Sequence, residues 1–162
     1  MKRLLWLLLT LCTIASAIQA RADDDYHRCM APSNSDNSDD QLAACSRYLE
    51  QTGHPNSERK TAYWQRGKIY QKSKQDYDSA IADYTQMIAL DPKDAHSFFL
   101  RAWAHMWKNY ANKNEDDCAP AHADFDQANA LAPNRYHFDA AFYERFGCGT
   151  PKQQDYTHLH DN

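Results

Sequence analysis

Glycine is scarce in this sequence, with four residues among 162, and runs of valine or isoleucine are absent. Alanine, aspartate and glutamine are common instead, and this balance favours helix over sheet. Four glycines cannot supply a glycine-rich phosphate-binding loop, and no G-x-S-x-G or H-E-x-x-H motif occurs. The composition therefore indicates an all-α protein, and we expect neither a cofactor nor an enzymatic activity.

Long apolar runs are missing except at the N-terminus. Residues 1–22 read MKRLLWLLLTLCTIASAIQARA, with two basic residues, a short apolar stretch and then small residues. This layout is typical of a secretory signal peptide, and we expect cleavage after Ala20 or Ala22. An uncleaved N-terminal anchor is the alternative. Once this segment is removed, no other stretch is long and apolar enough to span a membrane, so we expect a periplasmic or secreted protein.

A strong positive charge is also lacking. The chain carries a net charge of −4, and the signal segment would remove Lys2 and Arg3 and make the remainder more acidic. A net negative charge disfavours binding to the phosphate backbone of a nucleic acid. We therefore expect no nucleic-acid partner.

The cysteines lack the C-x-x-C spacing of zinc ribbons and thioredoxin-type sites. Cys12 lies in the signal segment, which leaves an even number of cysteines in a chain that we expect to be exported. Three pairings are open, and proximity in sequence favours Cys29–Cys45 and Cys118–Cys148. Reduced, buried thiols are the alternative.

What the sequence does contain is an internal repeat. Residues 76–92 read DYDSAIADYTQMIALDP, and residues 117–133 read DCAPAHADFDQANALAP, 41 residues further on. Self-similarity at such a period indicates stacked units that bury their apolar faces only against each other. Each copy has an apolar stripe at helical spacing and a proline that ends the helix. The matching positions are Ala80 and Ala121, Tyr84 and Phe125, Pro92 and Pro133.

A second helical stripe, formed by Tyr63, Gly67 and Tyr70, precedes the first copy. Glycine inside a helix costs about 1 kcal/mol relative to alanine. Such a glycine is reasonable where another backbone crosses closely. The pattern therefore predicts two antiparallel helices per unit, with Gly67 facing Ala80.

These motifs resemble the tetratricopeptide repeat, with units at 60–94 and 95–134. Half units flank them, and the leading one begins with a capping box of Ser38 and Gln41. The resemblance covers 38–147 and implies a short α-solenoid of about six antiparallel helices, closed by the disulfides. One extra residue lies in the turn of the first unit. In the second, about seven residues enlarge the turn, and the next helix resumes at Pro120. Residues 23–37 are expected as an acidic linker and 148–162 as a flexible tail.

The register of the repeat places one set of side chains on the inner, concave face. Three aromatic residues and a methionine in the second unit form a large apolar surface, which is typical of a contact site. The alternative is that neighbouring helices, the insertion or the tail cover these side chains. The predicted groove residues are Trp64, Lys68, Gln71, His96, Phe99, Trp103, Met106, Tyr136, Asp139 and Tyr143.

The sequence gives weak signals for a metal. His158 and His160 lie in the expected tail, and residues 33–40 lack the glycine and glutamate of a calcium loop. The repeated aspartates, among them Asp76, Asp83 and Asp124, are expected to cap and solubilise helices. We therefore predict no metal site.

The resemblance implies a protein–protein interaction module or scaffold in the cell envelope that binds a peptide or helix of another protein. Self-association through the apolar ends of a short array is a further option. One alternative is a small envelope enzyme or its accessory subunit, which would gather Lys68, His137 and Asp139 around one cavity. Another is a purely structural factor, in which Phe99 and Trp103 would be buried.

Overall fold

The computed structural model describes residues 20–21, 23–32, 37–113, 117–133, 135–136 and 140–149. Within these ranges all regular elements are helical and no strand occurs, which confirms the all-α prediction. Residues 23–30 are helical. The elements that follow are α2 (Ser38–Glu50), α3 (Asn56–Ile69), the π-helix η1 (Tyr70–Lys74), α4 (Tyr77–Leu90), α5 (Ala95–Asn112), α6 (Cys118–Leu131) and α7 (Ala140–Arg145).

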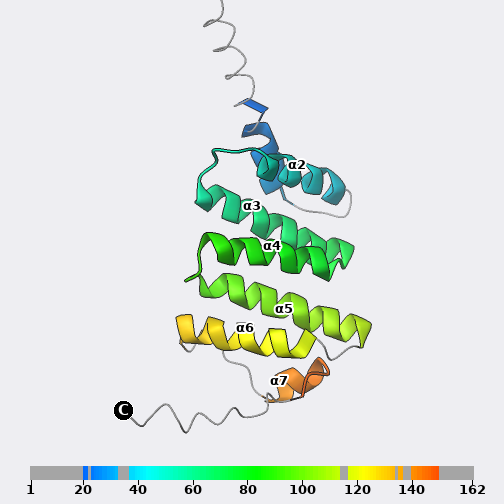
Figure 1. Cartoon of the computed structure of the whole chain (residues 1–162). Coiled ribbons are helices and arrows are strands. Elements are labelled where there is room, and N and C mark those ends of the chain that lie inside the picture. Colours follow the sequence, from blue (N-terminus) through cyan, green and yellow to red (C-terminus); the bar gives the residue numbers. More distant parts are fainter. Residues whose placement is uncertain are drawn as a thin grey trace, which may run out of the picture.

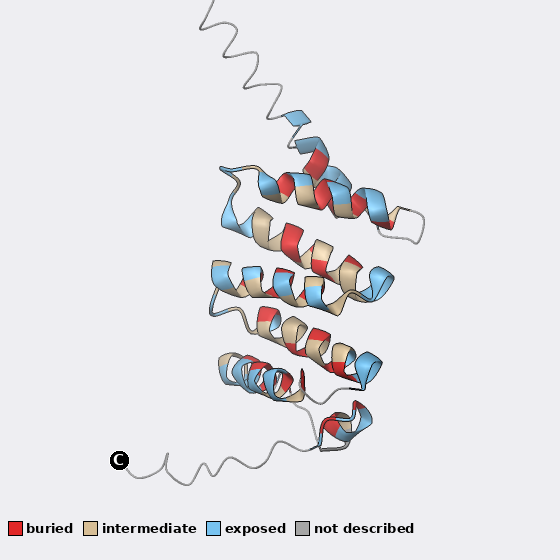
Figure 2. Cartoon of the chain, turned by 45° about the vertical axis from the view of Figure 1, so that its right-hand side comes forward, coloured by how far each residue is buried: buried red, intermediate tan, exposed pale blue. Residues whose placement is uncertain are grey.

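Helices α2 to α6 are stacked side by side in the order of the sequence (Figure 1). Each packs mainly on its neighbours in sequence: α2 on α3, α3 on α4, α4 on α5, and α5 on α6. Short connections join most of them, so that consecutive helices run antiparallel. Buried and exposed positions alternate along each helix, with the buried positions between neighbours (Figure 2). The core is therefore a series of helix–helix contacts.

Aspartate side chains cap the N-termini of two of these helices. Asp76 precedes α4 and accepts hydrogen bonds from the backbone N–H and the hydroxyl of Ser79, at 3.1 and 2.7 Å. Asp94 precedes α5 and accepts from the N–H of His96 at 3.2 Å and the hydroxyl of Ser97 at 2.6 Å. Both carboxylates satisfy N–H groups that have no partner inside the helix. The expected capping role is confirmed for Asp76.

Asp83 and Asp124 are not helix caps, contrary to the prediction. They are buried in mid-helix, and each accepts two hydrogen bonds from an arginine of the preceding helix: Arg66 to Asp83 at 2.9 and 2.7 Å, and Arg101 to Asp124 at 2.7 Å twice. The reason is their position, because a carboxylate away from the N-terminus of a helix has no free N–H to cap and is stable in the interior only when paired.

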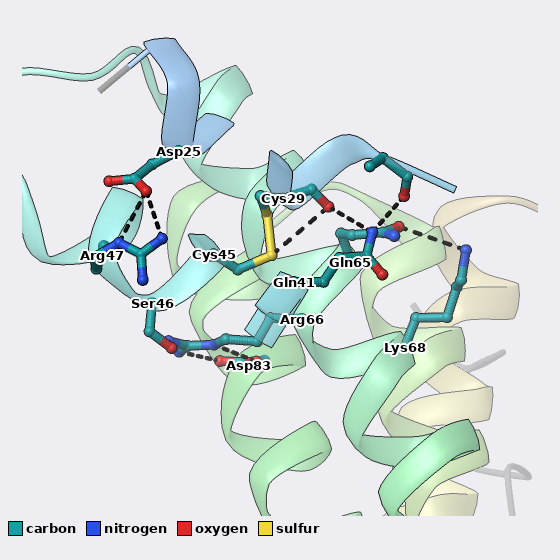
Figure 3. Close-up of a disulfide and its surroundings, with 11 residues drawn as sticks. Asp25, Cys29, Gln41, Cys45, Ser46, Arg47, Gln65, Arg66, Lys68 and Asp83 are labelled. Carbon is teal, nitrogen blue, oxygen red and sulfur yellow. Dashed lines mark hydrogen bonds and ion pairs between the residues drawn. A yellow bond between two sulfur atoms is a disulfide. The ribbon is translucent and has the colours of Figure 1, made fainter. Parts of the chain in front are cut away.

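A hydroxyl from the helix one further back completes each pair. Ser46 on α2 accepts from Arg66 at 3.0 Å, and Thr85 on α4 accepts from Arg101 at 3.2 Å. Figure 3 shows the first of these arrangements, in which Ser46, Arg66 and Asp83 join α2, α3 and α4. The same chemistry thus connects three successive helices twice.

Gly67 lies where α3 and α4 approach each other closely. A Cβ atom at this position would lie 2.8 Å from the ring of Tyr84 and 3.3 Å from the Cβ of Asp83. The prediction of a close crossing is therefore confirmed, although the nearest neighbours are Tyr84 and Asp83, whereas the sequence suggested Ala80. Of the predicted repeat-packing residues, six are buried: Tyr63, Gly67, Ala80, Tyr84, Ala121 and Phe125. Tyr70 is half-buried, and Pro92 and Pro133 are exposed beyond the ends of α4 and α6.

Both predicted disulfides are present. Cys29–Cys45 joins the helix at 23–30 to α2, and Cys118–Cys148 joins the start of α6 to the chain after α7. Cys29, Cys45 and Cys148 are fully or almost fully buried. Each disulfide therefore fixes one end of the stack to its nearest helix.

Residues 23–30 were expected within a linker, and this expectation is wrong because they form a helix. Asp25 is buried. Its Oδ1 atom accepts a hydrogen bond from Nε of Arg47 at 2.9 Å and forms an ion pair with Nη2 of the same guanidinium at 2.8 Å (Figure 3). The capping box is also wrong: Asn37 is the residue before α2, and the side chain of Gln41 donates to the carbonyls of Cys29 and Ala31. These contacts hold the leading helix on α2, in addition to the disulfide.

The insertion of the second unit does not enlarge the turn as predicted. Helix α5 continues through the first part of the insertion to Asn112, and α6 begins at Cys118. The added turns of α5 are held by packing on the residues after α7, because Trp107 lies 5.4 Å from the ring of Phe146 and Asn109 donates to the carbonyl of Phe146 at 2.6 Å. The insertion therefore lengthens one wall of the stack.

Candidate partner-binding groove

A groove with a volume of about 410 Å³ lies between α3 and α5. One wall comes from α3 and η1, the other from α5, and Tyr84 of α4 lies between them. Its lining is predominantly aromatic, with two lysines and no carboxylate. The lining residues are Trp64, Lys68, Gln71, Lys72, Tyr84, His96, Phe99, Leu100, Trp103 and Trp107.

Helical spacing explains why these side chains share one groove. Trp64, Lys68 and Gln71 are separated by four and three residues along α3 and η1, and Phe99, Trp103 and Trp107 by four each along α5. Residues at such intervals lie above one another on one face of a helix. Eight residues of helix rise about 12 Å, which sets the length of each wall.

The structure brings six of the ten predicted groove residues together: Trp64, Lys68, Gln71, His96, Phe99 and Trp103. Tyr136 is buried beside the groove, where its ring stacks on Phe99 at 4.6 Å. Asp139 lies outside the described residues.

Two predicted groove residues are in the core. Met106 is fully buried with Ala102 and Phe125. Tyr143 is also buried, and its ring lies 4.4 Å from that of His122. The register of the repeat predicts Met106 in the groove, but the side chain that α5 places there belongs to the next residue.

That residue, Trp107, is the main member that the sequence interpretation missed, together with Lys72 and Leu100. It is 36% exposed, which makes it one of two large hydrophobic residues in the described chain that are this accessible. Its ring stacks on Trp103 at 6.4 Å. The interval of four from Phe99 through Trp103 was the signal that identifies it.

Phe99 and Trp103 are half-buried, with part of each side chain facing the groove. Trp103 packs edge-to-face on Phe142 at 5.3 Å and on Phe146 at 5.4 Å. The core thus holds these rings in fixed positions, and the groove is bounded by aromatic surfaces that are already ordered.

The groove has a cationic side and a neutral side. Lys68 Nζ lies 4.8 Å from the centroid of the Trp64 ring, a cation–π contact. Across the groove, burial lowers the pKa of His96, so that this ring is neutral at pH 7. Its Nδ1 atom lies 3.4 Å from the hydroxyl of Tyr136. At neutral pH the positive charge therefore comes from α3 and η1.

Three of the described lysines have carboxylate partners. Lys60 pairs with Asp91 and Asp94 at 2.8 Å each. Lys74 pairs with Asp39 at 2.6 Å, and Lys108 with Asp78 at 2.9 Å. Among the described residues, Lys68 and Lys72 have no carboxylate within ion-pair distance. The two groove lysines thus carry uncompensated charge.

A smaller depression of about 280 Å³ adjoins the groove at Trp107, and we call it the annex. It is lined by Gln71, Lys72, Gln75, Tyr77 and Trp107. A separate depression lies between the end of α5 and α7, around Tyr110 and Phe146. The groove and annex share three residues and form one continuous surface.

Within the described ranges, no three histidine, cysteine or acidic side chains cluster in a way that would hold a metal ion. His158 and His160 are outside those ranges, as are His137 and Asp139, so the cavity that the enzymatic alternative required is not described. No helix in the described part of the chain has the length and apolar character to cross a membrane.

Comparison with protein-family models, with curated proteins and with solved structures finds no match to this chain.

Proposed function

We propose that this protein is an exported, tetratricopeptide-like helical array that binds a segment of another protein in the groove between α3 and α5. The observation that carries the proposal is the groove itself, in which Trp64, Phe99, Trp103 and Trp107 line a volume of about 410 Å³. Aromatic rings that are partly exposed yet held in place by a core lose little entropy on binding, and they dominate the energetics of many interfaces.

The dimensions of the groove favour a short occupant. Walls of about 12 Å match one face of two helical turns, or about four residues of extended chain. An occupant of this size is part of a larger partner, which is consistent with a scaffold or interaction module in the cell envelope. Two disulfides are compatible with an oxidising compartment such as the periplasm.

Site-specific photo-crosslinking in cells tests the proposal. A benzophenone amino acid replaces Trp64 or Trp107 on opposite walls of the groove, and Asn129, which is exposed on α6, serves as the control position. We expect both groove positions to give the same crosslinked partner and Asn129 to give none. Crosslinks of equal yield from Asn129, or different products from the two walls, would contradict a shared groove occupant.

A further inference from the structure

The annex has a different chemistry from the groove that it adjoins. Each of its five lining residues carries a hydrogen-bond donor: two amides, an ammonium, a phenol and an indole N–H. Lys72 supplies one positive charge, and no carboxylate lines the annex. A small, donor-rich depression with a net positive charge is suited to an anionic group.

The neighbouring acidic residues do not neutralise this charge. Asp78 lies next to Tyr77 but pairs with Lys108 at 2.9 Å. Asp76 is engaged as the cap of α4 by Ser79. Both nearby carboxylates therefore have partners other than Lys72.

Gln71 is oriented in a way that favours an anion. Its Oε1 atom accepts a hydrogen bond from the hydroxyl of Tyr84 at 3.1 Å. Tyr84 is buried, which fixes its hydroxyl and hence the amide. Because the amide oxygen is already used, the NH₂ group of Gln71 is the part that remains to donate.

The backbone at the annex is also unusual. Residues Tyr70–Lys74 form a π-helix, which accommodates the extra residue of this turn, and Gln75 after it has φ 54°, in the left-handed region. Helical residues with this geometry are rare and occur frequently at binding sites, because the wider turn redirects side chains. Here the turn contributes Gln71, Lys72 and Gln75 to one depression.

We propose that the annex binds the carboxylate of an internal Asp or Glu side chain of the partner, while an adjacent apolar residue of the same segment packs on Trp103 and Trp107. This inference rests on the proposed groove function and specifies its ligand. Charge complementarity supports it, since the uncompensated lysines of the groove and annex lie on an otherwise acidic protein with a net charge of −4.

Selection from a random displayed-peptide library, with the oxidised protein purified from a periplasm, supplies the test. Selected sequences are then synthesised with amidated C-termini, so that only internal carboxylates remain. Binding is followed by tryptophan fluorescence, because Trp64, Trp103 and Trp107 all line the groove. We expect an acidic residue at a constant distance from an aromatic or aliphatic residue.

Charge reversal at Lys72 provides the sharper comparison. Lys72→Glu is expected to lower the affinity of the acidic peptides at least tenfold, and a new selection with this variant should favour basic residues at the same peptide position. The control is Lys93→Glu, which changes an exposed lysine in the α4–α5 turn. It should alter neither the affinity nor the selected sequences. Selected peptides that are apolar without an acidic residue would overturn this inference and leave the groove function intact. If none of the selected peptides changes the tryptophan fluorescence of the protein, the result would contradict both this inference and the groove function.

Discussion

Arg101 on α5 and Asp124 on α6 form two parallel hydrogen bonds of 2.7 Å across the helix interface, and Arg66 and Asp83 form the same arrangement between α3 and α4. These hydrogen bonds raise the pKa of Arg101, which remains charged. The pairs recur because the sequence repeats, with the arginines 35 residues apart and the aspartates 41. The repeat thus preserves a buried polar contact as well as an apolar stripe.

Removing one partner of this contact should be more harmful than removing both. Asp124→Ala leaves the guanidinium of Arg101 without its partner and is expected to lower the free energy of unfolding by about 3 kcal/mol. The double variant Arg101→Met, Asp124→Leu removes both charges and should recover most of that loss. Urea denaturation measures both, and a double variant that is less stable than Asp124→Ala would contradict this view of the pair.

Gly67→Ala tests the close crossing of α3 and α4. The added methyl group would meet the ring of Tyr84 at 2.8 Å, and that ring is buried and cannot move freely. Overpacking costs about 1–3 kcal/mol, which outweighs the gain of about 1 kcal/mol in helix propensity. We expect a lower midpoint of thermal unfolding. Gly53→Ala is a useful comparison because nothing lies within 4 Å of that position, although its φ of 93° makes the substitution unfavourable for a local reason.

The disulfides should contribute separately at the two ends of the stack. They close loops with sequence separations of 16 and 30. On the chain-entropy model these contribute about 3 and 4 kcal/mol respectively to the stability of the folded state. The paired substitution of Cys29 and Cys45 by Ser should lower the unfolding midpoint and increase hydrogen exchange in 23–30, while exchange in α6 changes little.

Mass spectrometry checks that both bonds form. The protein should be lighter before reduction than after it by the mass of four hydrogen atoms. Four free thiols at Cys29, Cys45, Cys118 and Cys148 in protein prepared without reductant would contradict the pairing.

Stability should fall below neutral pH because two histidines have a lowered pKa in the folded protein. Burial lowers the pKa of His96 and of His122, and the Nε2 atom of His122 is buried without a hydrogen-bond partner. In the unfolded chain a histidine has a pKa of about 6.5. The unfolded state therefore binds protons first as the pH falls below this value, which favours unfolding until the folded pKa is passed.

A matched variant isolates one of these contributions. His122→Phe keeps a ring opposite Tyr143, which His122 contacts edge-to-face at 4.4 Å, but cannot bind a proton. We expect the free energy of unfolding of this variant to decrease less between pH 7.5 and pH 5 than that of the parent. An identical decrease would show that His122 does not contribute.

The repeat in the sequence predicted those features of the fold that depend on interactions between residues close together in the chain. Helical stripes, the prolines after α4 and α6, and Asp76 as a cap all act within one or two turns, and they were confirmed. The helix at 23–30 could not be predicted in this way, because Asp25 and Cys29 are stabilised by Arg47 and Cys45, which are distant in sequence. The extension of α5 likewise depends on Phe146, almost forty residues after Trp107.

The groove was predictable in part for the same reason. Register placed Trp64, Lys68 and Trp103 on one face, but a single-residue error along α5 exchanged Trp107 for Met106. Lys72 was not predicted as a groove residue because the π-helix shifts the helical register after Tyr70. The extra residue in the turn is the one sign of this shift in the sequence, and it does not show where along the helix the shift occurs.

The most direct test of the groove is the affinity of the crosslinked partner for two variants one turn apart on α5, measured by calorimetry. Trp107 lines the groove, whereas Tyr110 is 58% exposed and lines the other depression, and both rings contact Phe146. If the groove holds the partner, Trp107→Ala weakens binding at least tenfold and Tyr110→Ala leaves it unchanged, with similar unfolding midpoints for both. Equal affinities for the two variants would contradict a binding site between α3 and α5.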